Sequence, residues 1–243
     1  MDKCIVTTSW DDCQQFDEKL SSLLLDFGIK AAFYIAKSWE GRLVNTDLIR
    51  ELDKNFEIGA HTISHPTLTS IDLRCAFEEI KNSKEWLEEL VNHEIEMFSY
   101  PKGKYNNEIV KLVERAGFKG ARTLDFQIAL PKNQFRLGVG SQASNGSPLI
   151  RLKASLNSKL SLKSLVDWRV NAKLLFDRML ERGGIWHLWG HSWEIEKNRE
   201  WKTLEDVLAY VSNIKNVAYL TNGQIIKLIR AHNAVPSDEK VLS

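Results

Sequence analysis

Short apolar runs alternate with amphipathic stretches along most of the chain. Runs rich in β-branched and aromatic side chains are typical of buried strands. They occur at residues 5–8, 30–36, 56–60, 95–100, 118–123, 135–139, 149–156, 185–190 and 217–221. Stretches with apolar residues three and four positions apart predict helices, which we place at residues 16–27, 46–54, 71–91, 107–116, 167–182 and 203–213.

The alternation of strand and helix predicts parallel strand pairing with right-handed crossovers. We therefore expect a single α/β domain over residues 1–230. The segment 138–147 is rich in Gly, Ser and Asn and predicts a loop, and the polar segment 231–243 predicts a frayed C-terminal tail. No internal repeat or low-complexity linker divides the chain.

Composition narrows the possible partners. The 243 residues are 43% apolar and 27% charged, which is typical of a protein with a substantial core. The net charge of +1 gives no reason to expect a nucleic acid or an anionic membrane as a partner, and no stretch approaches the ~18 apolar residues of a membrane span. The first predicted strand follows Met1 too closely for a signal peptide, and three cysteines without a CxxC spacing predict reduced thiols. We therefore expect a cytoplasmic protein, and nothing in the sequence indicates its oligomeric state.

Carboxylate and imidazole groups follow two of the predicted strands. Asp11 and Asp12 come after the first apolar run, and His61 and His65 come after the run at residues 56–60. Open and barrel α/β folds build their active sites at these carboxyl ends of strands. One carboxylate and two imidazoles would hold a zinc-like ion with a fourth position left for water, and the second carboxylate would be free to act as a base. The residues therefore predict a metal-dependent hydrolase.

Three motifs carry a family resemblance that extends over residues 5–224. Residues 8–12 (TSWDD) resemble a T-F-D-D motif, residues 61–66 (HTISHP) resemble H-[ST]-x-x-H-P, and residues 98–103 (FSYPKG) resemble R-x-P-x-G with its Arg replaced by Ser99. In this order the motifs are similar to those of the polysaccharide deacetylases, the NodB-like domain of carbohydrate esterase family four. The resemblance implies a distorted (β/α) barrel, usually of seven strands.

The resemblance also implies roles for the matched residues at the two strand ends. Asp11 would be the general base, and Asp12 would hold one divalent metal ion together with His61 and His65. The ion would be zinc, with cobalt, nickel and manganese as alternatives that an Asp/His/His set also accepts. Its role would be to activate a water molecule for attack on the substrate.

Further residues are expected to contact the substrate. The resemblance places an oxyanion donor at the backbone N–H of Tyr100, which precedes the motif proline Pro101; the same dipeptide also reads as the end of a strand. Trp189 is expected to wall the acyl pocket. We include Pro101 and Trp193 with it as substrate-binding residues.

The leaving amine needs an acid, which must come from late in the chain. The apolar segment 184–190 leads to His191, which resembles the histidine of the family's L-x-H motif, and the continuation to Glu194 is similar to the H-P-x-E ending of hydrolases that act on small amides. We assign His191 as the general acid. Because strand side chains alternate with period two, His187 shares its face, and there we expect a hydrogen-bonded core histidine.

Two departures from the family pattern concern the environment of Asp11. Ser99 stands where an arginine would pair with the base, and Ser164 stands at the first Asp of the D-x-x-D-W motif. Losing both members of an ion pair leaves neither as an unpaired buried charge. The tuning of Asp11 would then come from the metal and His191, and Asp167 is as well explained as a helix N-cap.

We therefore expect a deacetylase that acts on a non-peptide carbon–nitrogen amide bond. Its substrate would be an acetylated glycan, sugar conjugate or precursor that carries an N-acetyl, or less commonly an O-acetyl, group. Two alternatives stay open. The H-x-x-E ending also fits a small-molecule amidohydrolase acting on ureides or cyclic amides, and the altered motifs also fit a catalytically degenerate glycan-binding module. The retained Asp11 argues against the latter, because binding alone needs no base.

Overall fold

The computed structural model describes residues 4–144 and 167–234, and its strands form one large parallel sheet. The strands are β1 (Cys4–Asp11), β2 (Ala31–Ile35), β5 (Glu57–Ala60), β6 (Met97–Ser99), β7 (Gly120–Phe126), β8 (Leu137–Val139), β9 (Ser141–Gln142), β10 (Gly184–Gly190) and β11 (Val217–Tyr219). A separate antiparallel hairpin consists of β3 (Ser38–Trp39) and β4 (Arg42–Leu43). The predicted strand at 149–156 lies outside the described residues.

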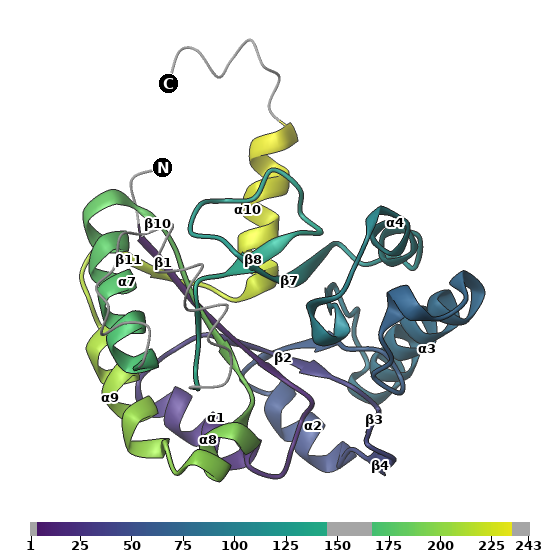
Figure 1. Ribbon diagram of the computed structural model, residues 1–243, viewed down its shortest axis with the longest axis horizontal. Helices are drawn as coiled ribbons and strands as arrows, with labels where there is room; N and C mark the ends of the chain where they lie inside the picture. The colour runs from purple at the N-terminus through teal and green to yellow at the C-terminus, as the bar shows by residue number, and fades with distance from the viewer. Residues whose placement is uncertain (1–3, 145–166, 235–243) are drawn as a thin grey trace.

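Helices lie around the outside of the sheet (Figure 1). They are α1 (Asp17–Asp26), α2 (Thr46–Asp53), α3 (Leu73–Val91), α4 (Asn107–Arg115), α7 (Trp168–Arg182), α8 (Ser192–Asn198), α9 (Trp201–Val211) and α10 (Asn222–Ala234), with 3₁₀ turns at Leu68–Ser70 and Pro101–Gly103. Among the described residues, no helix is long and apolar enough to cross a membrane. The expected α/β class is confirmed.

The sheet curves into a nearly closed barrel, and the segment that closes it was predicted partly as the strand 135–139 and partly as the loop 138–147. The strand order is β8-β7-β6-β5-β2-β1-β10-β9, and only Gly140 separates β8 from β9. This residue donates its N–H to the carbonyl of His187 at 2.9 Å. Residues 137–142 therefore fill one position between β7 and β10, which gives seven positions around the described barrel. The predicted strand at 135–139 contains β8 and is confirmed, whereas the loop prediction was wrong over residues 138–142. Small residues here allow close packing, because a Cβ on Gly140 would lie 2.7 Å from Leu175.

The two faces of the sheet have different contents. A large apolar cluster that includes Val6, Trp10 and Phe33 lies between the sheet and the surrounding helices. A smaller cluster that includes Ile5 and Ile185 fills the barrel interior. Because strand side chains alternate, the remaining odd-numbered positions of β1 and β10 also point inward, and many of them are polar. Polar groups therefore occupy the barrel axis toward the carboxyl ends of the strands.

Helix α10 closes the opposite end of the barrel. Its buried residues Ile225, Ile226 and Ile229 belong to the interior cluster, and Figure 1 shows the helix standing across that end. Glu57 holds its first turn by accepting hydrogen bonds from the N–H of Gly223 at 2.9 Å and the hydroxyl of Thr221 at 2.6 Å. The predicted tail was placed too early, because α10 continues to Ala234; residues 235–243 lie outside the described residues.

Burial raises the pKa of Glu57 to about 7, so this carboxyl should make stability depend on pH. A carboxyl with a raised pKa in the folded state stabilises the protein fully below its ordinary pKa, and this contribution is lost as pH rises toward 7. Glu57→Gln removes the titration. We expect the free energy of unfolding of the wild type to fall, relative to this variant, between pH 4.5 and 7. Urea titrations at several pH values measure this, and parallel curves for the two proteins would contradict it.

Candidate active site

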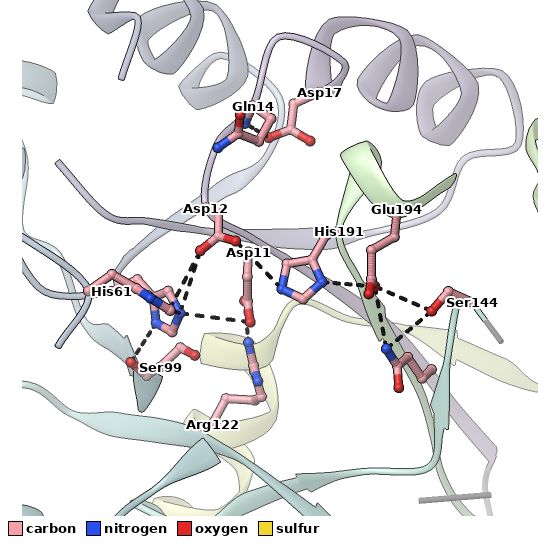
Figure 2. Close-up of polar contacts among 12 residues, drawn as sticks. Asp11, Asp12, Gln14, Asp17, His61, Ser99, Arg122, Ser144, His191 and Glu194 are labelled. Atoms are coloured by element: carbon pink, nitrogen blue, oxygen red, sulfur yellow. Dashed lines mark hydrogen bonds and ion pairs between the residues drawn. The ribbon is translucent and has the colours of Figure 1, made fainter. Parts of the chain in front are cut away.

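The carboxyl ends of three barrel strands bring the predicted catalytic and metal-binding residues together (Figure 2). Asp11 is the last residue of β1 and Asp12 follows it. His61 comes directly after β5, with His65 four residues later in the same loop. His191 comes directly after β10. The sequence therefore placed these five side chains at the correct end of the barrel.

Asp12, His61 and His65 form a compact group, called here the Asp/His/His cluster. Their ligand atoms all lie within 4.8 Å of one another, and no other such group occurs in the described part of the chain. The Nε2 atoms of His61 and His65 are 3.1 Å apart, and Oδ1 of Asp12 lies 4.0 Å and 3.7 Å from them. Two imidazole nitrogens and one carboxylate oxygen thus converge on one point.

The chemistry of this cluster fits a divalent cation. Oδ1 of Asp12 is buried and has no hydrogen-bond partner among the described residues. His61 donates its Nδ1–H to the carbonyl of Ser99 at 2.8 Å, which leaves the lone pair of Nε2 directed at His65. Burial lowers the pKa of His61 to about 3, so its ring is neutral, as a metal ligand must be. A cation would satisfy the carboxylate and both nitrogens.

Asp11 pairs with Arg122, a residue that the sequence analysis did not single out. The Nη2 of Arg122 donates to Oδ1 of Asp11, and the guanidinium is fully buried in β7. Burial by itself raises the pKa of the Asp11 carboxyl, but the charge of Arg122, helped by His61 and His191, holds this pKa below its usual value. The expectation that the metal and His191 alone tune Asp11 was therefore incomplete.

The position of Arg122 explains how the family arginine could be lost. Ser99 in β6 lies directly opposite Arg122 in the pairing with β7. A guanidinium from the neighbouring strand therefore reaches the base from almost the same place as the missing side chain at position 99. The sequence did contain a sign of this, because a charged residue within the predicted buried strand 118–123 requires a partner.

His191 is held by a carboxylate and lies beside the Asp/His/His cluster. Its Nδ1–H donates to Glu194 at 3.0 Å, and its Nε2 lies 3.6 Å from Oδ2 of Asp12. The same Glu194 oxygen accepts from Gln142 at 3.4 Å and from Ser144 at 3.3 Å. Burial lowers the pKa of His191, but the hydrogen bond to Glu194 and the nearby aspartates outweigh it, so the net pKa is raised.

His187 lies deeper in the barrel, as expected for a core histidine. Its Nε2 is 2.9 Å from the hydroxyl of Ser9, and its Nδ1 is 2.8 Å from the carbonyl of Gly138. Burial lowers its pKa to about 3, so the ring is neutral. Both ring nitrogens are therefore occupied by protein groups away from the strand ends.

A row of aromatic rings crosses the site. Trp39 and Trp193 are 5.7 Å apart between ring centroids, Trp193 and His191 are 5.3 Å apart, and His191 and Trp189 are 5.5 Å apart. Both predicted tryptophans thus flank the candidate acid. The hairpin residue Trp39, which the sequence analysis did not single out, extends the row outward.

The predicted oxyanion donor is already used within the sheet. The N–H of Tyr100 donates to the carbonyl of Arg122 at 3.3 Å, because it continues the β6–β7 ladder. In this structure the N–H is therefore engaged within the sheet, and the oxyanion role of Tyr100 stays a prediction. The neighbouring Pro101 is buried and begins a 3₁₀ turn.

The other altered motif, which resembles D-x-x-D-W at residues 164–168, lies only partly within the described residues. Asp167 is the N-cap of α7 and accepts a hydrogen bond from the N–H of Arg169 at 2.9 Å. This supports the N-cap interpretation of Asp167. Ser164 lies outside the described residues.

A pocket of about 340 Å³ opens beside the Asp/His/His cluster and is within the size range of small-ligand sites. Its wall includes an aromatic face and several groups that can form hydrogen bonds with a ligand. They are Asp12, Gln14, Gln15, Trp39, Arg42 and Asn45. The hairpin of β3 and β4 forms its outer edge.

Comparisons of sequence agree with this site. The family model described as polysaccharide deacetylase matches residues 1–121. YxkH from Bacillus subtilis (strain 168), a protein assigned by name to the polysaccharide deacetylases, is 26% identical over 121 residues. That alignment covers 49% of this chain and 43% of YxkH. The chain therefore matches less than half the length of this curated relative.

Solved structures show the same fold. A protein from Mycobacterium smegmatis with the same designation has a TM-score of 0.71 at 18% identity, over 96% of this chain and 92% of that one. The chitin deacetylase of Colletotrichum lindemuthianum has a TM-score of 0.60 at 13% identity, over 91% and 86% of the two chains. At these identities the likeness concerns the barrel and not the substrate.

Proposed function

Because the chain belongs to the polysaccharide deacetylase family, we propose that it hydrolyses the acetamide group of an acetylated sugar, glycan or glycan precursor. The observation that carries this proposal is the division between two adjacent carboxylates. Asp12 turns an unpartnered oxygen toward His61 and His65, while Asp11 is held by Arg122. One carboxylate is thus placed to bind a cation and the other to accept a proton, which is more than a binding module needs.

The Asp/His/His cluster would hold one divalent ion. Zinc suits two neutral imidazoles and one carboxylate, and cobalt, nickel or manganese can use the same donors. When bound, such an ion would lower the pKa of a coordinated water and polarise the acyl carbonyl. With the Tyr100 N–H engaged in the sheet, the positive charge of such an ion would also stabilise a developing negative charge on the acyl oxygen.

Asp11 and His191 would carry the two proton transfers. Asp11 stays ionised beside Arg122, so its carboxylate accepts the proton of the attacking water. His191 keeps its Nδ1–H on Glu194 and has a raised pKa, so the proton that it can give up sits on Nε2, on the side of the cluster. That proton would go to the departing amine, which is a poor leaving group without it.

The surroundings favour a sugar as substrate. The apolar faces of pyranose rings pack on indole rings, and hydroxyl groups bond to amides. The pocket beside Asp12 offers both, with Trp39 in its wall next to Gln14 and Gln15. Pro101, Trp189 and Trp193 remain the other proposed substrate contacts. An amine leaves only when it is protonated, whereas the alkoxide of an ester leaves more easily without an acid. Because His191 provides that acid, we expect N-acetyl groups to be preferred over O-acetyl groups.

The ureide alternative loses its special support. It was drawn from the H-x-x-E ending and from the arginine missing at Ser99, whose place beside Asp11 is taken by Arg122. Glu194 binds His191 directly and so serves proton transfer, whichever amide is cleaved. A degenerate module is disfavoured by the pairing of Asp11 with Arg122, since binding does not require a buried ionised base.

The test combines metal content with product release. The purified protein should contain about one divalent ion per chain and should release acetate from at least one member of a panel of N-acetylated sugars and conjugates. His61→Ala should lose both, because it removes one of three protein ligands. Ureides and O-acetylated sugars in the same panel separate the alternatives. Wild-type metal content in the double variant of His61 and His65 would contradict the assignment.

A further inference from the structure

The loop that carries both histidines has an unusual backbone. Thr62 has φ of 71° and His65 has φ of 56°, in the left-handed region that residues with a Cβ seldom adopt. Within the loop, the hydroxyl of Thr62 accepts the N–H of His65 at 3.0 Å. Such a conformation persists only where the surroundings hold it in place.

A carboxylate on helix α3 holds this loop from outside. Oε2 of Glu79 accepts the N–H groups of Ile63 and Ser64, both at 2.9 Å, and Oε1 accepts the hydroxyl of Ser64 at 2.7 Å. Glu79 lies on α3 between Ala76 and Ile80, which are buried against the barrel, so its backbone is fixed. On the other side of the loop, the carbonyl of Ile63 accepts the N–H of Ser38 at 2.8 Å.

We propose that Glu79 is a positioning residue for the metal centre, which sets the metal affinity of the Asp/His/His cluster through the backbone of residues 62–65. Its three hydrogen bonds fix the two residues between the left-handed Thr62 and His65. They thereby keep Nε2 of His65 at 3.1 Å from Nε2 of His61. Without them the loop can relax toward ordinary backbone angles, and His65 then leaves the cluster. The inference rests on the proposed function, because it requires that the cluster bind a metal ion.

The experiment is a zinc titration of the metal-free full chain against a chromophoric chelator, which reports affinity without any substrate. Glu79→Ala should raise the Kd for zinc about 10- to 100-fold, the range for groups that orient metal ligands. Glu79→Gln should restore most of the affinity, because one amide oxygen can still accept both N–H groups. Ser64→Ala removes only the hydroxyl bond and should weaken binding by less than Glu79→Ala.

Glu78→Ala is the matched control. Glu78 is the preceding residue of α3, and within the described part of the chain its carboxylate pairs only with the exposed Arg74, at 3.3 Å. The zinc affinity of Glu78→Ala should equal that of the wild type. Thermal unfolding of the metal-free proteins checks that Glu79→Ala is folded at the titration temperature. If Glu79→Ala is unfolded, the zinc affinities of Ser64→Ala and Glu79→Gln are compared with that of the wild type instead.

The outcomes separate this inference from the proposed function. If the wild type binds zinc and a folded Glu79→Ala binds it equally well, Glu79 has no positioning role while the metal centre stands. Weakened binding in Glu79→Ala that Glu79→Gln does not restore would also overturn it, because the hydrogen bonds would then not be the cause. If the wild type binds no divalent ion, the proposed function fails and this inference with it.

Discussion

Replacing Asp11 with asparagine should lower the rate of acetate release about 10²- to 10⁴-fold while the metal content stays near one ion per chain. An amide has nearly the shape of a carboxylate but cannot accept the proton of the attacking water. The metal should remain because Asp12, and not Asp11, belongs to the Asp/His/His cluster. Steady-state kinetics on the best acetylated substrate, with metal analysis of the same sample, measures both quantities.

Asp12→Asn is the companion variant, and its primary defect should be in metal binding and not in proton transfer. It removes a ligand, so the metal should be lost first and the activity with it; added zinc should recover part of the activity. Asp11→Asn should show no such recovery. Turnover of Asp11→Asn near the wild-type level would remove the base role from this residue, whatever its metal content.

Replacing Arg122 with methionine should lower the free energy of unfolding by about 3–5 kcal/mol. The substitution removes the charged partner of a carboxylate that is itself buried, and an uncompensated buried charge is one of the costliest changes in a protein. Methionine fills a similar volume, so a cavity contributes little to the loss. Urea unfolding monitored by tryptophan fluorescence is suited to this measurement because Trp189 lies 5.6 Å from the guanidinium.

A double variant tests whether the charge is the cause. Combining Arg122→Met with Asp11→Asn removes both charges, so the double variant should be more stable than Arg122→Met alone. If the two substitutions simply add, the loss in Arg122→Met comes from packing and not from the ion pair. The metal ion should be removed before these measurements so that its binding does not contribute to the apparent stability.

Hydrophobic patterning predicted most of the barrel because both the apolar runs of the strands and the three-to-four-residue spacing of apolar positions in the helices are clear in the sequence. The runs at residues 30–36 and 56–60 contain β2 and β5, and the run at 185–190 covers all of β10 except its first residue. The predicted helices match α1 to α4, α7 and α9 within a few residues. The missed elements have weak patterns. β9 has only two residues, α8 begins inside the candidate motif, and α10 is apolar only where it enters the barrel. Closure through Gly140 depends on close packing with α7, which no local pattern expresses.

The residues of the candidate site also fall into two groups, those that a local sequence pattern identifies and those that it does not. Asp12, His61 and His65 could be found because they follow strands at short, recognisable spacings. Arg122 and Glu79 could not be assigned, because each acts across elements distant in sequence, and their partners become visible only when the strands and α3 are placed. The family model ends at residue 121, directly before Arg122.

Strand β1 holds the proposed base, and its neighbours are distributed over the whole chain. It pairs along its length with β10, with Cys4 opposite Gly184 and Trp10 opposite Gly190. During synthesis β1 is therefore complete long before this neighbour exists. Pairings of such large sequence separation form slowly and leave strand edges open to association in the meantime. The carboxylates of Asp11 and Asp12, at the end of β1, thus reach their final surroundings late in folding. Until β10 is made, the unpaired edge of β1 is where a nascent chain of this protein needs shielding from other chains.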